Sequence, residues 1–102
     1  MKETLEQLKA GRQRLVTKGW VKGVNTHRKE NCVLTALPGY AKPVVPASLL
    51  CAEIALYNVL PVERRRDDGG VVVSLIRYND APATTLDDIL ALYDRAIQAE
   101  AL

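Results

Sequence analysis

The prolines constrain the fold of this chain more than any other feature of its sequence, because they fix where helices begin and end. Pro38 follows a short apolar segment, and Pro43 and Pro46 bias the residues before them away from helical conformation. Pro46 also suits the first turn of a helix, and Pro61 stops one. The sequence therefore predicts short helices joined by Pro-bounded connections.

The apolar pattern between these breaks predicts a mainly α fold, a compact bundle of about four helices. With 102 residues, the whole chain (1–102) is expected to form a single helical domain, because a split leaves two pieces too small for separate cores. The apolar content of 48% is sufficient for one core. We expect helices over residues 4–18, 32–37, 46–60 and 85–101.

Local signals support three of these helices. The first has an apolar repeat (Leu5, Leu8, Leu15, Val16), and Gly19 supplies the left-handed residue that closes it. Trp20 is then expected to fold back on its last turn. The helix over 46–60 is apolar nearly all round with Glu53 as its single charge, so we expect it to be the most buried element. Thr85, with Asp88 three residues later, resembles a capping box.

The segment over residues 71–78 is ambiguous. Its three consecutive valines favour a strand, but a lone strand needs a partner and the chain offers weak ones. We predict a short helix or an irregular segment here, with a short β element at 71–78 as the alternative. The Asn79 and Asp80 that follow suit a turn before Pro82, and the alternative is a polar cluster whose partner lies elsewhere in the chain.

Cysteine usage and hydropathy indicate a cytoplasmic protein. Cys32 and Cys51 lie in apolar patterns and are interpreted as reduced core thiols, with a disulfide between them as the alternative. The chain has a single histidine and no phosphate-loop motif, so neither a metal site nor a cofactor is expected. The polar start and the short apolar runs predict neither a signal peptide nor a membrane span.

Three short motifs mark places where elements begin or end. They are Gly19-Trp20, Cys32 followed by Ala36-Leu37, and Tyr78-Asn79-Asp80 before the last helix. In these motifs the chain resembles a family of small proteins of unknown function found in actinobacteria and their phages, where Trp-Asn-Asp is expected in place of Tyr78-Asn79-Asp80. The resemblance implies a mainly helical fold, brings no known activity or cofactor, and implies one spatial cluster of Trp20, Cys32, Asn79 and Asp80.

Three functions are compatible with these residues. A thiol enzyme needs Cys32 activated by a base such as His27, whereas a buried, inert Cys32 is the plainer interpretation. A nucleic-acid-binding protein would use the basic N-terminal third. Its candidate anion surface consists of Arg14, Lys18, Lys22, Arg28 and Lys29.

A protein-interaction role fits the composition best, because metal and phosphate motifs are absent from the sequence. Tyr40, in the Pro-bounded connection, is the candidate anchor, and the alternative is that its ring packs over the helix before it. The resemblance to phage proteins implies a host protein as the partner. We therefore predict a non-enzymatic module that binds a host protein, with no membrane partner and an unassigned oligomeric state.

Overall fold

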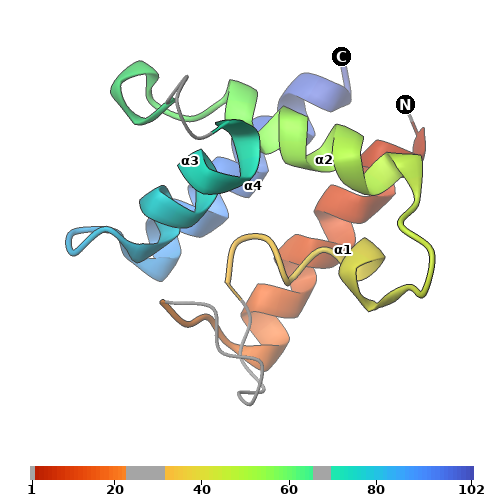
Figure 1. Cartoon of the computed structure of the whole chain (residues 1–102), viewed down its shortest axis with the longest axis horizontal. Helices are drawn as coiled ribbons and strands as arrows, with labels where there is room; N and C mark the ends of the chain where they lie inside the picture. Colours follow the sequence, from red (N-terminus) through yellow and green to blue (C-terminus); the bar gives the residue numbers. More distant parts are fainter. Residues whose placement is uncertain (1, 23–31, 66–69) are drawn as a thin grey trace.

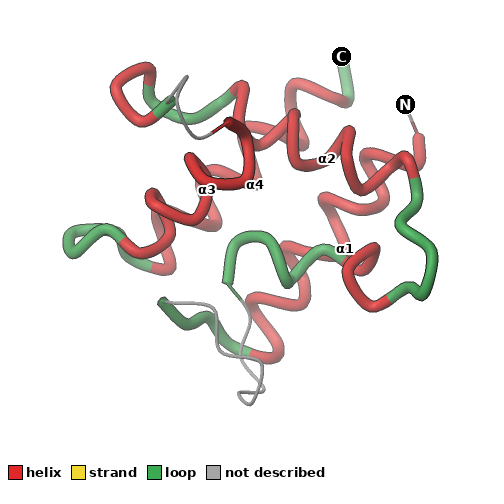
Figure 2. The backbone as a smooth tube through the Cα atoms, viewed as in Figure 1, coloured by secondary structure: helices red, strands yellow, loops and turns green. Residues whose placement is uncertain are grey.

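The computed structural model describes residues 2–22, 32–65 and 70–102, which form four α-helices and two short 3₁₀ helices without a sheet (Figures 1 and 2). The predicted mainly α bundle of about four helices is confirmed. The elements are α1 (Lys2–Lys18), η1 (Pro38–Ala41), α2 (Ala47–Asn58), η2 (Val62–Arg64), α3 (Gly70–Asp80) and α4 (Leu86–Glu100).

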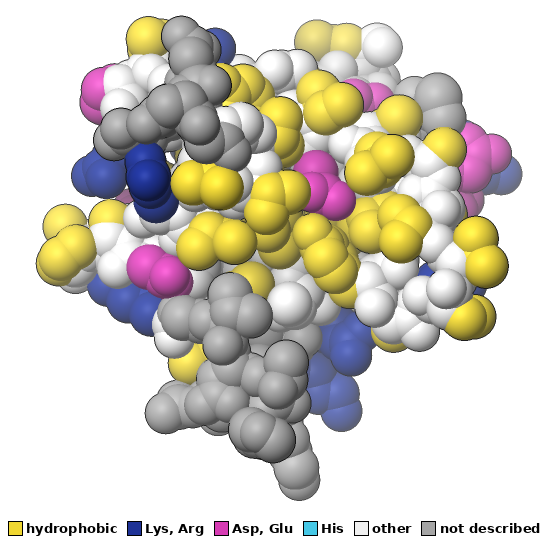
Figure 3. Space-filling view, viewed as in Figure 1, with side chains coloured by type: hydrophobic (Ala, Val, Ile, Leu, Met, Phe, Trp, Pro, Cys, Tyr) yellow, Lys and Arg dark blue, Asp and Glu magenta, His cyan; other side chains and the backbone are white. Residues whose placement is uncertain are grey.

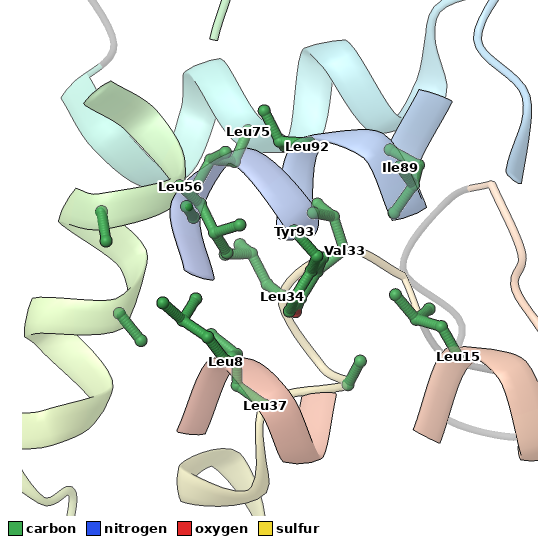
Figure 4. Close-up of a cluster of buried hydrophobic side chains, with 14 of the residues drawn as sticks. Leu8, Leu15, Val33, Leu34, Leu37, Leu56, Leu75, Ile89, Leu92 and Tyr93 are labelled. Carbon is green, nitrogen blue, oxygen red and sulfur yellow. The ribbon is translucent and has the colours of Figure 1, made fainter. Parts of the chain in front are cut away.

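Helix α4 lies against both α1 and α2, and α3 packs on α2. The radius of gyration is 12.4 Å, close to the value of about 13 Å for a compact domain of 100 residues. One core of buried side chains receives residues from all four α-helices. Residues 32–37 run through this core, and Figure 4 shows the side chains of Val33 and Leu34 between α1 and α4.

Residues 32–37 do not form the predicted helix. They form consecutive turns, with hydrogen bonds from Ala36 N to the Cys32 carbonyl (3.3 Å) and from Leu37 N to the Leu34 carbonyl (3.0 Å). A segment this short before a proline gains too few backbone hydrogen bonds to offset helix nucleation. Its predicted N-cap, Asn31, lies outside the described residues. The chain instead continues into η1, in the region predicted to end a helix and begin an irregular connection.

Helix α1 buries part of the predicted face, since Leu8 and Leu15 are fully buried. Gly19 closes the helix with a φ of 93°, as predicted. Val16, however, is exposed, and the buried face consists of Thr4, Gln7, Leu8, Gly11 and Leu15. Gly11 explains the choice of face, because a Cβ atom there would lie 2.9 Å from Tyr93 Cε1. The absent side chain lets α1 approach α4 closely.

Helix α2 packs against α1, α3, α4 and η1 and buries a larger share of its residues than the other α-helices do, as predicted, although it is not buried all round. The helix buries Leu49, Ala52, Ala55 and Leu56 on one face, but Leu50 and Ile54 are exposed and Cys51 is half-buried. Its single charge, Glu53, is buried instead. A helix that is apolar all round gives no sign of which side faces water, so the buried side cannot be predicted from its sequence pattern.

Residues 71–78 lie within helix α3, so the helical interpretation is correct and the alternative β element is wrong. The helical period places Ser74, Leu75 and Asn79 toward the core, with Val72 exposed. Packing on α2 therefore outweighs the strand preference of the three valines. Asn79 and Asp80 are the last two residues of α3, so the turn predicted for them is not formed at these positions.

Helix α4 begins as predicted. Thr85 Oγ1 accepts a hydrogen bond from Asp88 N (3.3 Å), and Asp88 Oδ2 accepts one from Thr85 N (2.9 Å), which completes the capping box. These two residues are thus explained by helix initiation. The helix buries Ile89, Leu92, Tyr93 and Ala96.

Replacing Gly11 with alanine is expected to destabilise the protein. In an exposed helix the change stabilises by about 0.5–1 kcal/mol, but here the new Cβ would lie 2.9–3.1 Å from atoms of Tyr93 and Leu37. Overpacking of this kind costs about 1–3 kcal/mol. Urea denaturation of both proteins measures the difference, and a more stable Gly11→Ala variant would contradict the close approach of α1 to α4.

Candidate functional site

The side chain of Asn79 joins three parts of the chain that are distant in sequence. It is 1% exposed, and its Oδ1 accepts hydrogen bonds from Trp20 Nε1 (2.6 Å) and Val33 N (2.9 Å). Its Nδ2 donates to the carbonyl of Val21 (3.1 Å) and to Asp80 Oδ1 (3.0 Å). Both donors and both acceptor positions of the amide are therefore used.

The residues that the family resemblance placed in one cluster lie around this amide. Trp20 bonds to Asn79 through its indole nitrogen rather than serving only as the apolar contact of the α1 cap. Asp80 accepts from the same amide, and Cys32 precedes Val33, whose backbone N–H is bound. The contacts to Asn79 satisfy buried polar groups and hold the fold together, whereas the side chain of Asp80 is exposed.

Lys22 lies at the surface next to this cluster. Its Nζ donates to the carbonyls of Ala81 (2.7 Å) and Pro82 (3.0 Å) just beyond α3, and it lies 5.9 Å from the ring centroid of Trp20. One member of the candidate anion surface is therefore engaged within the protein. Arg14 and Lys18 are exposed on α1. The other two members, Arg28 and Lys29, lie outside the described residues.

Cys32 is buried and its sulfur faces Thr35. Thr35 N and Thr35 Oγ1 each lie 3.5 Å from Cys32 Sγ, and Cys32 N donates to Thr35 Oγ1 (3.0 Å). Cys32 and Cys51 are both free thiols, so the alternative disulfide is not formed. The prediction that Cys51 lies in the core is wrong, because it is only partly buried on α2 and does not belong to the core cluster. His27, the proposed base for Cys32, lies outside the described residues.

Two further polar residues secure the buried segment and were missed by sequence reasoning. Tyr93 is fully buried and its hydroxyl donates to the carbonyl of Val33 (2.6 Å). Burial raises the pKa of Tyr93 well above its ordinary value. Gln7 accepts from Gly39 N (3.0 Å) and donates to Ser48 Oγ (3.3 Å), joining α1 to η1 and α2. The spacing of Gln7 between Thr4 and Gly11 was the available signal, since all three share one helical face.

Tyr40 and Glu53 form a further polar contact, between η1 and α2. The phenol of Tyr40 donates to the carboxylate of Glu53 on α2. Burial, followed by the nearby charge of Glu53, raises the pKa of Tyr40 to about 12. Burial also raises the pKa of Glu53, and the hydrogen bond from Tyr40 opposes that rise. Tyr40, the predicted interaction anchor, is therefore tethered by its hydroxyl while its ring remains half-exposed.

Two exposed apolar surfaces remain once these contacts are accounted for. The first, here called the 40–45 loop, comprises residues 40–45 and exposes Val44 and Val45. The second, here called the α2 stripe, comprises Ala47, Leu50, Cys51 and Ile54. Figure 3 shows apolar side chains gathered across the viewed face over α2 and α3, with an acidic side chain among them. Both surfaces border the Tyr40–Glu53 contact, because the loop begins at Tyr40 and Glu53 adjoins the stripe on α2.

Within the described ranges, no three side chains of His, Cys, Asp or Glu come together as a metal ion would require. None of the described helices is both long and apolar enough to cross a lipid bilayer.

Replacing Asn79 with alanine is expected to destabilise the protein strongly. The change leaves Trp20 Nε1 and Val33 N without their acceptor, at about 1–3 kcal/mol for each buried donor. A double-mutant cycle with Trp20→Phe, followed by urea denaturation, tests the pairing. Asn79→Ala should cost less in the Trp20→Phe background, since one donor is already absent. Additive losses would show that the indole–amide bond contributes nothing.

Glu53 is expected to make stability fall as pH rises. Its pKa is raised in the folded state, so above pH 4.5 the native protein holds this proton more tightly than the unfolded chain. The contribution is present below the unfolded pKa and is lost as pH passes through the folded pKa. The stability of Glu53→Gln relative to the parent should therefore increase with pH from about 4.5 upward. Glu63→Gln, at an exposed position, is the control and should follow the parent.

The comparisons with known proteins agree with the predicted resemblance at the level of the family. Residues 1–99 match the family of unknown function DUF6197, and the chain belongs to that family. No curated protein and no solved structure matches the chain.

Proposed function

We propose that this member of DUF6197 is a non-enzymatic module that binds another protein through the 40–45 loop. The observation that carries the proposal is the exposure of two neighbouring apolar side chains, Val44 at 79% and Val45 at 58%. An apolar pair this exposed gains free energy when a partner removes it from water, at about 25 cal/mol per Å² of apolar surface.

The loop is held in place before any partner binds. Gln7 fixes η1 at Gly39, and Tyr40 is tethered to Glu53, so the beginning of the loop is anchored to α1 and α2. Pro43 and Pro46 restrict the backbone on both sides of the two valines. Binding then costs less conformational entropy than ordering a free segment would. Tyr40 acts mainly as the tether of the loop and adds the half-exposed side of its ring to the contact.

The chemistry of the loop specifies the kind of partner. An apolar cleft is needed for Val44 and Val45, and an acidic group beside it would pair with the exposed Lys42. The resemblance to phage proteins implies that this partner is a host protein. The binding of nucleic acid is less well supported, because Lys22 is engaged by the carbonyls of Ala81 and Pro82. A thiol enzyme is also less well supported, because Cys32 is buried.

A comparative capture experiment tests the proposal. The tagged protein and its Val44→Glu/Val45→Glu variant are incubated with nuclease-treated actinobacterial lysate, and bound proteins are quantified by mass spectrometry. We expect one or a few proteins to be enriched on the parent and lost from the variant. The loss follows because two carboxylates would have to be buried in an apolar cleft.

The matched control is Val16→Glu/Val62→Glu, which adds the same charge at valines that are 52% and 73% exposed on α1 and η2. It should capture the same proteins as the parent. If both double variants retain the parent's partners, the 40–45 loop is not the contact surface. A parallel capture from untreated lysate completes the test: if proteins are enriched only there and are lost after nuclease treatment, the basic residues of α1 become the binding surface instead.

A further inference from the structure

A hollow of about 360 Å³ lies where the first half of α1, η1 and the beginning of α2 meet. Its apolar walls are Ala10, Pro38 and Pro46. Gln7 also lines it and joins α1 to the other two elements by hydrogen bonds, so the walls are held in place by one side chain. The volume falls within the range of about 300–1,000 Å³ that is typical of sites for small molecules.

The hollow is lined by charges of both signs, and they come from different elements. Glu3 and Glu6 lie one helical turn apart on α1, and Lys42 directly follows η1. None of these three side chains forms an ion pair with another residue of the described part of the chain. The neighbouring basic residues of α1, Lys2 and Lys9, are not among the lining residues. The hollow therefore presents an unpaired acidic side and an unpaired basic side.

Unused hydrogen-bond donors lie at the beginning of α2. The residue before this helix is Pro46, which supplies no side-chain cap, and the N–H groups of Ala47 and Ser48 have no acceptor within residues 2–22, 32–65 and 70–102. Gln7 is 8% exposed and uses one of its two amide N–H donors on Ser48 Oγ (3.3 Å), which leaves the other unused among the described residues. Free N–H groups at a helix N-terminus bind carboxylates, and the helix dipole adds to that attraction.

We propose that this hollow binds a small aliphatic amino acid. Its carboxylate lies at the first turn of α2, with Lys42 and the hydroxyl of Ser48, and its ammonium group lies beside Glu3 and Glu6. Its aliphatic part covers the apolar walls. A plain carboxylic acid would be repelled by the two glutamates, and a plain amine by Lys42 and the α2 dipole, so the hollow favours a molecule that carries both charges.

Titration of the ¹⁵N-labelled full chain, followed by its amide chemical shifts, tests the proposal. The probes are leucine and 6-aminohexanoate, in which the two charges are close together or far apart. We expect saturable shifts with at least one of them, centred on Gly39 and Ser48. Its N-acetyl derivative lacks the ammonium charge and its amide derivative lacks the carboxylate. Each derivative should bind at least tenfold more weakly.

Two variants assign the charged groups. Glu3→Gln/Glu6→Gln should bind the amino acid at least tenfold more weakly and no longer distinguish it from the N-acetyl derivative. Lys42→Met should weaken binding in the same way and no longer distinguish the amino acid from the amide derivative. Glu63→Gln and Lys9→Met remove charges at exposed positions outside the hollow and should bind like the parent. The amide spectrum of each variant also shows whether it is folded.

Three results would overturn the proposal. The first is a parent whose shifts do not saturate with either amino acid at about 10 mM, where a site with a dissociation constant of about 1 mM is mostly occupied. The second is equal binding of the amino acid and both derivatives. The third is unchanged binding and selectivity in Glu3→Gln/Glu6→Gln and Lys42→Met. The capture experiment on the 40–45 loop is independent of these results, because it replaces Val44 and Val45.

Discussion

The burial of residues 32–37, which form turns and lead into η1, is the constraint on which the rest of the structure depends. Backbone groups in a helix satisfy each other, but those of a buried turn need partners from elsewhere. Val33 receives both of its partners from side chains, with Asn79 accepting from its N–H and Tyr93 donating to its carbonyl. Gly39 N is satisfied in the same way by Gln7. Helices α1, α3 and α4 thus each contribute one buried polar side chain to residues 32–37 and η1. Removing any one of these side chains leaves a backbone group without a partner in the core.

This constraint also explains features that look unrelated in the sequence. The hydroxyl of Tyr93 has to reach Val33 from α4, and α1 passes beside the same ring, so Gly11 is needed where a side chain would collide with it. Asn79 does more than satisfy Val33, because its remaining bonds draw in Trp20 and Val21 from the chain beyond α1. The polar residues of this core therefore determine how the helices are placed, because each of them fixes one helix relative to the buried segment. A core of aliphatic residues alone would give the helices less specific positions.

Sequence reasoning succeeded where the determining interaction is local. The capping box of Thr85 and Asp88 and the left-handed Gly19 depend on residues within one helical turn, so their patterns are sufficient. Sequence reasoning failed where the packing of the core determines the local structure or the face that is buried. The apolar run over 32–37 predicted a helix where the buried chain forms turns, and an apolar α2 gives no indication that Leu50 faces outward. The pairing of Asn79 with Trp20 spans 59 residues, and neither residue type specifies the other. The resemblance to a family supplied that cluster as an implication, which local pattern could not.

The polar side chains of the core form hydrogen bonds within the protein. The proposed binding of a partner protein therefore relies on exposed apolar side chains. The 40–45 loop leads through Pro46 directly into α2. Its beginning is held by the hydrogen bond from Gly39 N to Gln7 and by the contact of Tyr40 with Glu53. The same polar contacts that hold the buried segment in place therefore also fix the position of the loop that carries Val44 and Val45, so a loss of these contacts would disturb the core and the exposed loop together.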